Sequence, residues 1–522
     1  FHFCLRTNET ISSISSARRR RLAAYCMFSA FPPFLWYYLK GGIRLGHTLE
    51  RLPPKTIEKV FFVFMLSAGL VLVVFFISGL FSSRGVSSSS DYAVANRKAG
   101  VRGVSGVILG SLVGGAATVG TVQMAYQWGL SALWFTLGSG AACLLMGLWF
   151  VTPLRSVELI TLPQYLGRHF GKRTALLVAV STASGSFLSV IAQFLSGVAL
   201  MRSVFPVSTG VAALLTGALI LAFVFGGGIK SFSRLGEAKI IFLYMVMLLC
   251  SGVVLVQGWT PGAIIEALPS EPFFNILSRG AGKDLGSFAS LLCGVLCGQI
   301  YIQAVYTASS NATAKKGCLW AAFIIPPMGF LGTWIGLSMR ASGVAVEASQ
   351  ALPFFIQTSF HPVLGGLLWS GIMITVLGTA VGVSLGVATN LTRDIFLKMK
   401  VAAHFDDVKI LLASRVIVLA VVAAAGTVAC ASRNSMILQW AYLGMGVKAS
   451  GIFCLMLAAV LRPGRLSHAW SFAAGIGGLL GVAGGAFVGG GLDPLFPGLA
   501  LSGLVVLIGL SRGRVEALPW DC

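Results

Sequence analysis

The sequence has little charge for its length. Lys, Arg, Asp and Glu make up only 10% of 522 residues, and just 16 residues are acidic. Soluble globular domains carry about 25% charged residues, so this composition excludes an ordinary soluble protein. Instead, 56% of the residues are hydrophobic, 64 are glycine, and the mean hydropathy is +0.87. Together with long apolar runs, this predicts an all-α polytopic membrane protein whose surroundings are a lipid bilayer.

The sequence also lacks the motifs of common enzyme classes. We find no nucleophile with an accompanying base, and no glycine-rich run is followed by the Lys-Ser/Thr pair of a phosphate-binding loop. The ten cysteines show no metal-ligand spacing; Cys293 and Cys297 are four residues apart without histidine partners. We therefore predict no enzymatic activity, no cofactor, no metal cluster and no disulfide framework.

The net charge of +22 is concentrated in short loops between apolar runs. In a soluble protein this charge would suggest nucleic acid, but here it follows the enrichment of Lys and Arg in cytoplasmic loops. The pattern predicts a cytoplasmic C-terminus, a cytoplasmic 160–171 loop and no nucleic-acid partner. Residues 1–57 contradict it with four consecutive arginines. We interpret 1–57 as an uncertain tail, either non-native or a targeting segment.

Thirteen apolar runs are long enough to span a bilayer. They predict one helix zero, two groups of five and a final pair, near residues 60–80; 103–126, 132–152, 175–201, 207–226 and 238–257; 286–308, 318–339, 362–390, 412–431 and 437–461; 467–490 and 494–511. A five-plus-five core predicts two inverted repeats. The chain then divides into the tail, helix zero with a cytoplasmic loop, the first repeat, an extracellular loop, the second repeat, and two extra helices with a C-terminal tail: 1–57, 58–102, 103–257, 258–285, 286–461 and 462–522.

Residues 110–123 place four glycines and two threonines inside a predicted span. Irregular backbone at membrane depth persists only where it lines a cavity or is buried in protein, and carbonyls freed there can bind cations. Inverted repeats should be interrupted at matching places, and the second repeat has Gly294 and Gly298 before Gln299. The alternative is that these glycines only let helices pack closely.

Several motifs together resemble the sodium/solute symporter family. They are the glycine stretch above, Ser90-Asp91-Tyr92, Ile-Thr-Leu-Pro-Gln-Tyr-Leu-Gly-Arg-His-Phe-Gly at 160–171, Gly226 to Lys230, and Gln-Ile-Tyr-Ile-Gln-Ala at 299–304. The likeness extends from about residue 60 to about residue 465, and the 160–171 loop is its most specific part. It implies a leucine-transporter-type fold with sodium, the coupling ion, bound between the break in the first core helix and the eighth core helix.

Carried over residue by residue, the family's cation site falls on the carbonyls of Ala116 and Val119 and on Thr375, Gly378 and Thr379. Gly378 departs from the family pattern, which usually has a hydroxyl residue there. The positions of the family's second sodium site are Gly236, Val381 and Gly382. The resemblance therefore implies that the second site is missing.

Two lysines, Lys239 and Lys448, lie in predicted spans, and no span contains a clear acidic residue. A centred lysine costs about 2.5–3.5 kcal/mol on insertion scales. Lys448 lies about 16 Å from either end of its helix at helical rise, so we expect it to bind an anionic substrate. For Lys239 three alternatives are open. It snorkels to the inner membrane interface, or it pairs with Glu237 or with the backbone of the eighth core helix. Alternatively, its ammonium reaches the sodium site from a position one helical turn beyond Gly236.

Other polar side chains in the spans are candidates for substrate contact, because hydrocarbon would otherwise penalise them. Several must instead bond neighbouring helices, and we expect fewer than half to touch substrate. The candidates are Thr118, Gln123, Ser184, Gln193, Gln299, Tyr301, Gln303 and Tyr306.

These observations predict a secondary active transporter of the cell membrane. It would carry a small polar solute, expected to bear a carboxylate, together with sodium by alternating access. Two alternatives stay open: a sodium-independent, proton-coupled transporter in which Lys239 replaces the ion, and a membrane sensor that keeps the transporter fold. The sequence leaves the identity of the solute and the oligomeric state open.

Overall fold

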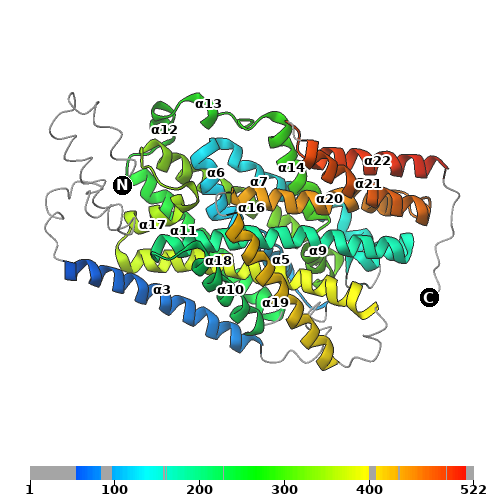
Figure 1. The fold of residues 1–522 in the computed structure, drawn as a ribbon, viewed down its shortest axis with the longest axis horizontal. Helices are drawn as coiled ribbons and strands as arrows, with labels where there is room; N and C mark the ends of the chain where they lie inside the picture. Colours follow the sequence, from blue (N-terminus) through cyan, green and yellow to red (C-terminus); the bar gives the residue numbers. More distant parts are fainter. Residues whose placement is uncertain are drawn as a thin grey trace.

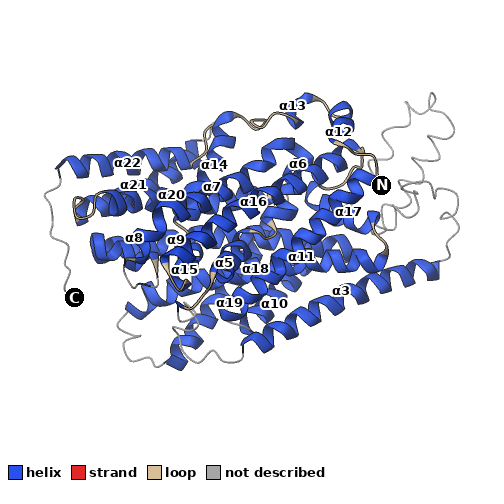
Figure 2. Cartoon of the chain, turned by 180° about the vertical axis from the view of Figure 1, so that it is seen from behind, coloured by secondary structure: helices blue, strands red, loops and turns tan. Residues whose placement is uncertain are grey.

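The computed structural model describes residues 54–83, 97–156, 159, 161–226, 229–398, 407–432, 435–488 and 491–512. Most of the uncertain tail, residues 1–53, therefore lies outside the described residues. Figure 2 shows that the described chain is almost entirely helical, and one isolated bridge between Ala99 and Ala308 is its only β-type pairing. The predicted all-α architecture is confirmed.

The helices follow the predicted order. Helix zero is α3 (Pro54–Ser83). The first repeat contains α5 (Val101–Leu112), η3 (Ala116–Gly120), α6 (Thr121–Trp128), η4 (Gly129–Leu133), α7 (Trp134–Leu145), η5 (Met146–Phe150), α8 (Val151–Arg155), α9 (Leu162–Val204), α10 (Thr209–Gly226) and α11 (Ile229–Val256). Two short helices, α12 (Pro261–Ala267) and α13 (Ser270–Phe273), lie in the predicted extracellular loop.

The second repeat contains α14 (Ala281–Leu296), α15 (Gln299–Thr307), α16 (Asn311–Ala341), η6 (Ala348–Gln350), α17 (Ala351–Ser359), α18 (Pro362–Thr389), η7 (Asn390–Ile395), η8 (Phe396–Lys398), α19 (Asp407–Ala431) and α20 (Ile437–Leu461). The chain continues with α21 (His468–Val488) and α22 (Leu495–Arg512). Among the described residues, nine helices are long and apolar enough to span a membrane, or ten if α14 and α15 form one bent span. The membrane class is thus confirmed, while the count of thirteen and the division into six regions stay predictions.

Helix α18 forms the centre of the molecule. In its most apolar stretch 94% of the residues are buried inside the protein, whereas the corresponding share is 28% in each of α19, α21 and α22. Figure 1 shows the arrangement: α3 runs along one edge against α18, and α21 and α22 lie at the opposite edge beside α20. A helix that is apolar all round must be surrounded by protein or lipid. Here α18 is surrounded by protein, so its few polar side chains face other helices.

Helix α9 begins with a separate short piece. The Thr161 hydroxyl accepts the backbone N–H of Gln164, which caps the helix start, and Gly171 interrupts the helix with φ 81°. Only glycine adopts this backbone region without strain. Residues 162–170 of the motif therefore form a short helix that meets the long part of α9 at a kink at Gly171.

Candidate functional site

The predicted break in the first core helix is present. Helix α5 ends at Leu112, Val113 has non-helical φ and ψ of −90° and 89°, and the chain resumes as a π-helical turn at Ala116. Close packing occurs at the same place, because a Cβ on Gly115 would lie 2.4 Å from the Cβ of Ser196 in α9. The break and the close packing of the glycines therefore occur at the same place.

The second repeat is interrupted at the matching place. Helices α14 and α15 are separated by Cys297 and Gly298 and are bent by 43°. The ring of Tyr301 fills the space that a side chain at Gly298 would need, since a Cβ there would lie 2.5 Å from it. Each repeat thus begins with a broken helix, as inverted repeats of transporters do.

Lys239 reaches the first break from α11. Its Nζ donates to the carbonyl of Gly110 at 2.7 Å and to the hydroxyl of Thr379 in α18 at 2.6 Å. The residue is only 3% exposed, so it does not snorkel to an interface. Gly378 lies beside the lysine stem, since a Cβ at that position would be in van der Waals contact with the lysine Cδ, at 3.4 Å. The lysine amine therefore occupies the space between the break and α18.

The carbonyls that face Thr379 differ from those the resemblance implied. The Thr379 hydroxyl lies 3.0 Å from the carbonyl oxygen of Gly110 and 3.4 Å from that of Val113. Gly110 lies in the last turn of α5 and Val113 directly follows that helix, where a helix end leaves carbonyls without intrahelical donors. Ala116 and Val119 lie beyond the break in the π-helical turn.

The other expected ligands are engaged locally. The carbonyl of Ala116 accepts the Thr121 hydroxyl at 3.2 Å, and the Thr375 hydroxyl donates to Gly371 within its own helix at 2.8 Å. Of the five expected cation-site residues, the structure brings only Thr379 and Gly378 against Lys239. Val381 and Gly382, expected at a missing second site, are buried in α18, and the surroundings of Gly236 lie outside the described residues.

Several polar candidates for substrate contact bond to protein instead. The Gln123 side-chain oxygen accepts the N–H of Ile437 at 3.0 Å, and that of Gln299 accepts the N–H of Leu162 at 2.9 Å. Thr118 donates to the carbonyl of Gly114 at 2.9 Å, while Ser184 is exposed on α9. This agrees with the expectation that many such groups serve helix packing. Tyr301, Gln303 and Tyr306 are buried in α15 beside the second break.

Lys448 is buried near the middle of α20, at 2% exposure. Its stem packs over Gly185 of α9, where a Cβ would lie 2.5 Å from the lysine Cγ. Among the described residues, no ion pair joins the Lys448 ammonium to a carboxylate. Lysine is rarely buried in proteins unless it is paired.

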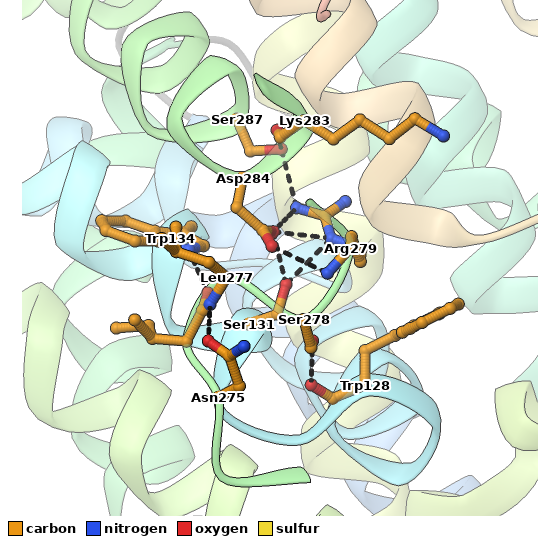
Figure 3. Close-up of polar contacts among 11 residues, drawn as sticks. Trp128, Ser131, Trp134, Asn275, Leu277, Ser278, Arg279, Lys283, Asp284 and Ser287 are labelled. Carbon is orange, nitrogen blue, oxygen red and sulfur yellow. Dashed lines mark hydrogen bonds and ion pairs between the residues drawn. The ribbon is translucent and has the colours of Figure 1, made fainter. Parts of the chain in front are cut away.

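A buried ion pair lies within the predicted extracellular loop, 258–285, and was missed from the sequence. Figure 3 shows Arg279 and Asp284, whose nearest side-chain atoms are 2.5 Å apart, together with Ser131 and Ser287, which bond to this pair. The guanidinium also lies 5.6 Å from the centre of the Tyr442 ring in α20. The pair joins the corner after α6 to the start of α14. Its only signal in the sequence is an arginine five residues before an aspartate.

Comparisons with known proteins identify the family. The model of the sodium:solute symporter family matches residues 92–478. The sodium/proline symporter of Staphylococcus aureus is 23% identical over 411 residues, which cover 72% of this chain and 78% of that protein. The high-affinity proline transporter PutP of Bacillus subtilis (strain 168) is 24% identical over 410 residues, covering 73% of this chain and 84% of that protein.

Two solved structures show a similar fold. A Na⁺-coupled sialic acid symporter in its substrate-bound outward-open state has a TM-score of 0.73 at 14% identity, covering 87% of this chain and 99% of that one. Mhp1, a nucleobase-cation-symport-1 family transporter in a closed conformation, has a TM-score of 0.55 at 13% identity, covering 83% and 97%. The broken helices, the fold and the family match agree: the chain belongs to the sodium:solute symporter family and is a multi-pass membrane transporter, not an enzyme.

Proposed function

We propose that this transporter takes up a small carboxylate-bearing solute. We also propose that a proton carried by Lys239 replaces sodium as the coupling ion. Membership of the family supports symport, with sodium as the family's coupling ion. The observation that distinguishes this chain is the pair of contacts from the Lys239 Nζ to Gly110 and Thr379, at 2.7 Å and 2.6 Å. The lysine supplies its own positive charge at the break.

The chemistry of this position suits either a sodium ion or an ammonium group. Carbonyl oxygens of an unwound helix and a threonine hydroxyl coordinate monovalent cations in broken-helix transporters. An ammonium group donates three hydrogen bonds to the same kind of oxygen atoms. Because burial disfavours a charged amine, a lysine at such a site can release its proton in one step of a transport cycle and regain it in another. Binding and release of a proton would then replace binding and release of sodium.

A second candidate is ordinary sodium coupling, which the family match and the relatives' names favour. In that case the Lys239 amine must leave Gly110 and Thr379 before sodium enters, because two cations cannot share the same oxygen atoms without strong repulsion. Thr379 and the carbonyls of Gly110 and Val113 would then hold the ion. The two candidates differ in what Lys239 does, so one experiment separates them.

The solute class rests on Lys448. A buried ammonium that has no carboxylate partner in the described part of the protein is stabilised by an anion, and a carboxylate accepts charge-assisted hydrogen bonds from it. The first turn of α15 adds the positive end of a helix dipole at the same break. Proline, named in the relatives above, bears a carboxylate and is the first solute to test. The sensor alternative has no support in the comparisons, whose named relatives are transporters.

The test measures proline uptake into proteoliposomes containing the purified full-length protein. Carboxylates, amino acids and sugars are screened first by thermal shift, and the strongest binder replaces proline if proline does not bind. We expect an inward proton gradient to drive uptake without sodium, and Lys239→Ala to abolish this driving force. If wild-type uptake requires sodium and Lys239→Ala leaves that requirement unchanged, the role of Lys239 is rejected and the second candidate stands.

A further inference from the structure

The break leaves two kinds of backbone group without helical partners: the carbonyls before it and the N–H groups after it. The last carbonyls of α5 face Thr379 and Lys239. The first amides after the break also lack helical acceptors, and each needs a partner at this depth. Gln193, in the middle of α9 and 4% exposed, provides one: its Oε1 accepts the N–H of Gly115 at 2.9 Å.

Gln193 and Thr379 approach the break from two sides. A Cβ placed on Gly114 would lie 2.4 Å from the Thr379 hydroxyl oxygen and 2.8 Å from Gln193 Oε1. Glycine at 114 is therefore what allows both side chains to reach the backbone. The Thr379 hydroxyl also accepts a hydrogen bond from Lys239. This hydroxyl therefore links Lys239 to the backbone at Gly114, which Gln193 approaches from the other side.

The amide oxygen of Gln193 is identified by its partner. A backbone N–H can only donate, so the side-chain atom that faces it must be the acceptor. The acceptor comes from α9, 78 residues along the chain from Gly115. The conformation at the break therefore depends on how α9 packs against it.

We propose that Gln193 is a positioning residue of the coupling site. Its hydrogen bond to the Gly115 amide keeps this stretch from closing into a continuous helix. The carbonyls of Gly110 and Val113 then stay directed toward Thr379. The proposal rests on the coupling site proposed above, but not on whether a proton or sodium acts there. Gln193 acts through the backbone, and among the described residues it makes no hydrogen bond to Lys239, which bonds Gly110 and Thr379.

The direct test is hydrogen–deuterium exchange of the peptide containing residues 110–123, measured on the full-length protein in lipid nanodiscs. Gln193→Met keeps the length of the side chain and removes the acceptor. We expect exchange in this peptide to become about tenfold faster, the effect of losing one buried hydrogen bond on local opening. Exchange in α10 should not change.

Two further variants separate this role from general packing. Gln193→Glu keeps an acceptor oxygen in the same place and should restore slow exchange in 110–123. Gln357→Met removes another buried glutamine, which donates to Ser203, and should leave 110–123 unchanged. If Gln193→Met exchanges like the wild type in 110–123, or if Gln357→Met accelerates that peptide equally, the positioning role is rejected. Neither result depends on which cation drives uptake, so this proposal can fail while the proposed function stands.

Discussion

In the proposed coupling site, Thr379 connects Lys239 to the broken helix. Its hydroxyl is within hydrogen-bonding distance of the Lys239 ammonium and of two carbonyls from α5. Thr379→Val keeps the shape of the side chain and removes the oxygen. A hydrogen bond to a charged group contributes about 1.5–3 kcal/mol, so we expect cation-driven uptake to fall more than about tenfold.

The matched control for this prediction is Thr379→Ser, which keeps the hydroxyl and should retain uptake close to the wild-type rate. Uptake and its dependence on sodium and pH are measured in proteoliposomes, with melting temperature as a check on folding. Thr379→Val with unchanged cation dependence would show that the hydroxyl takes no part in coupling.

The proposed contact between the Lys448 ammonium and the carboxylate of the solute can be tested by substitution. Lys448→Gln removes the positive charge while keeping a polar side chain of similar length. If the ammonium binds a carboxylate, the variant should bind proline at least about tenfold more weakly, the size of a lost charge-assisted hydrogen bond, and prolinamide nearly as the wild type does. Binding is measured by calorimetry on the purified protein. An equal loss for both solutes would assign Lys448 to packing against Gly185.

At the scale of elements, the Arg279–Asp284 pair joins η4, which follows α6, to the start of α14 through the Ser131 hydroxyl. Asp284 is fully buried and also accepts from Ser131, at 2.6 Å. Arg279→Leu leaves this carboxylate without its counter-charge, which destabilises a fold by about 3–5 kcal/mol. We expect a clearly lower melting temperature in detergent. Arg279→Leu combined with Asp284→Leu should recover much of the loss, and a double variant no more stable than the single one would contradict this account.

The connection between α21 and α22 predicts a pH dependence. Burial raises the pKa of the Asp493 carboxyl above its ordinary 3.8, although Leu495 donates its N–H to this group and Arg279 is nearby. A carboxyl with a raised folded-state pKa stabilises the fold most below the unfolded pKa, and this contribution is lost as pH rises through the folded value. Asp493→Asn should therefore melt at a higher temperature than the wild type at pH 7 and at the same temperature near pH 4. Parallel melting curves for both proteins across this range would exclude the effect.

At the scale of the whole molecule, the loop charges predict that residues 160–171 and the C-terminus face the cytoplasm. The orientation can be tested by labelling an introduced cysteine with a thiol reagent. Gly171 is a poor position for that cysteine, because it has φ 81° and lies against His468. The exposed neighbour Lys172 is a better site. Lys172→Cys should resist impermeant thiol reagents in intact cells and react after permeabilisation. Rapid labelling in intact cells would reverse the predicted topology.

The sequence by itself determined the class of the molecule, because the signals are local. Long apolar runs predict membrane helices, and glycines beside threonines predict a break wherever the helix must open. The breaks at Val113 and at Cys297–Gly298 were found in this way. The capped helix of the 160–171 motif likewise depends on near neighbours such as Thr161 and Gln164.

Only the tertiary structure decided which oxygen atoms meet which charges. Gly110 and Lys239 are 129 residues apart, and Lys239 and Thr379 are 140 apart. Counting along a motif placed the carbonyls at Ala116 and Val119, whereas packing turns those of Gly110 and Val113 toward Thr379. The partner of Gly115 likewise comes from α9, and no pattern within 110–123 indicates Gln193. A hydrogen bond between distant helices depends on how far each helix is shifted and rotated against the others, and that follows from side-chain packing over the whole core rather than from any one segment.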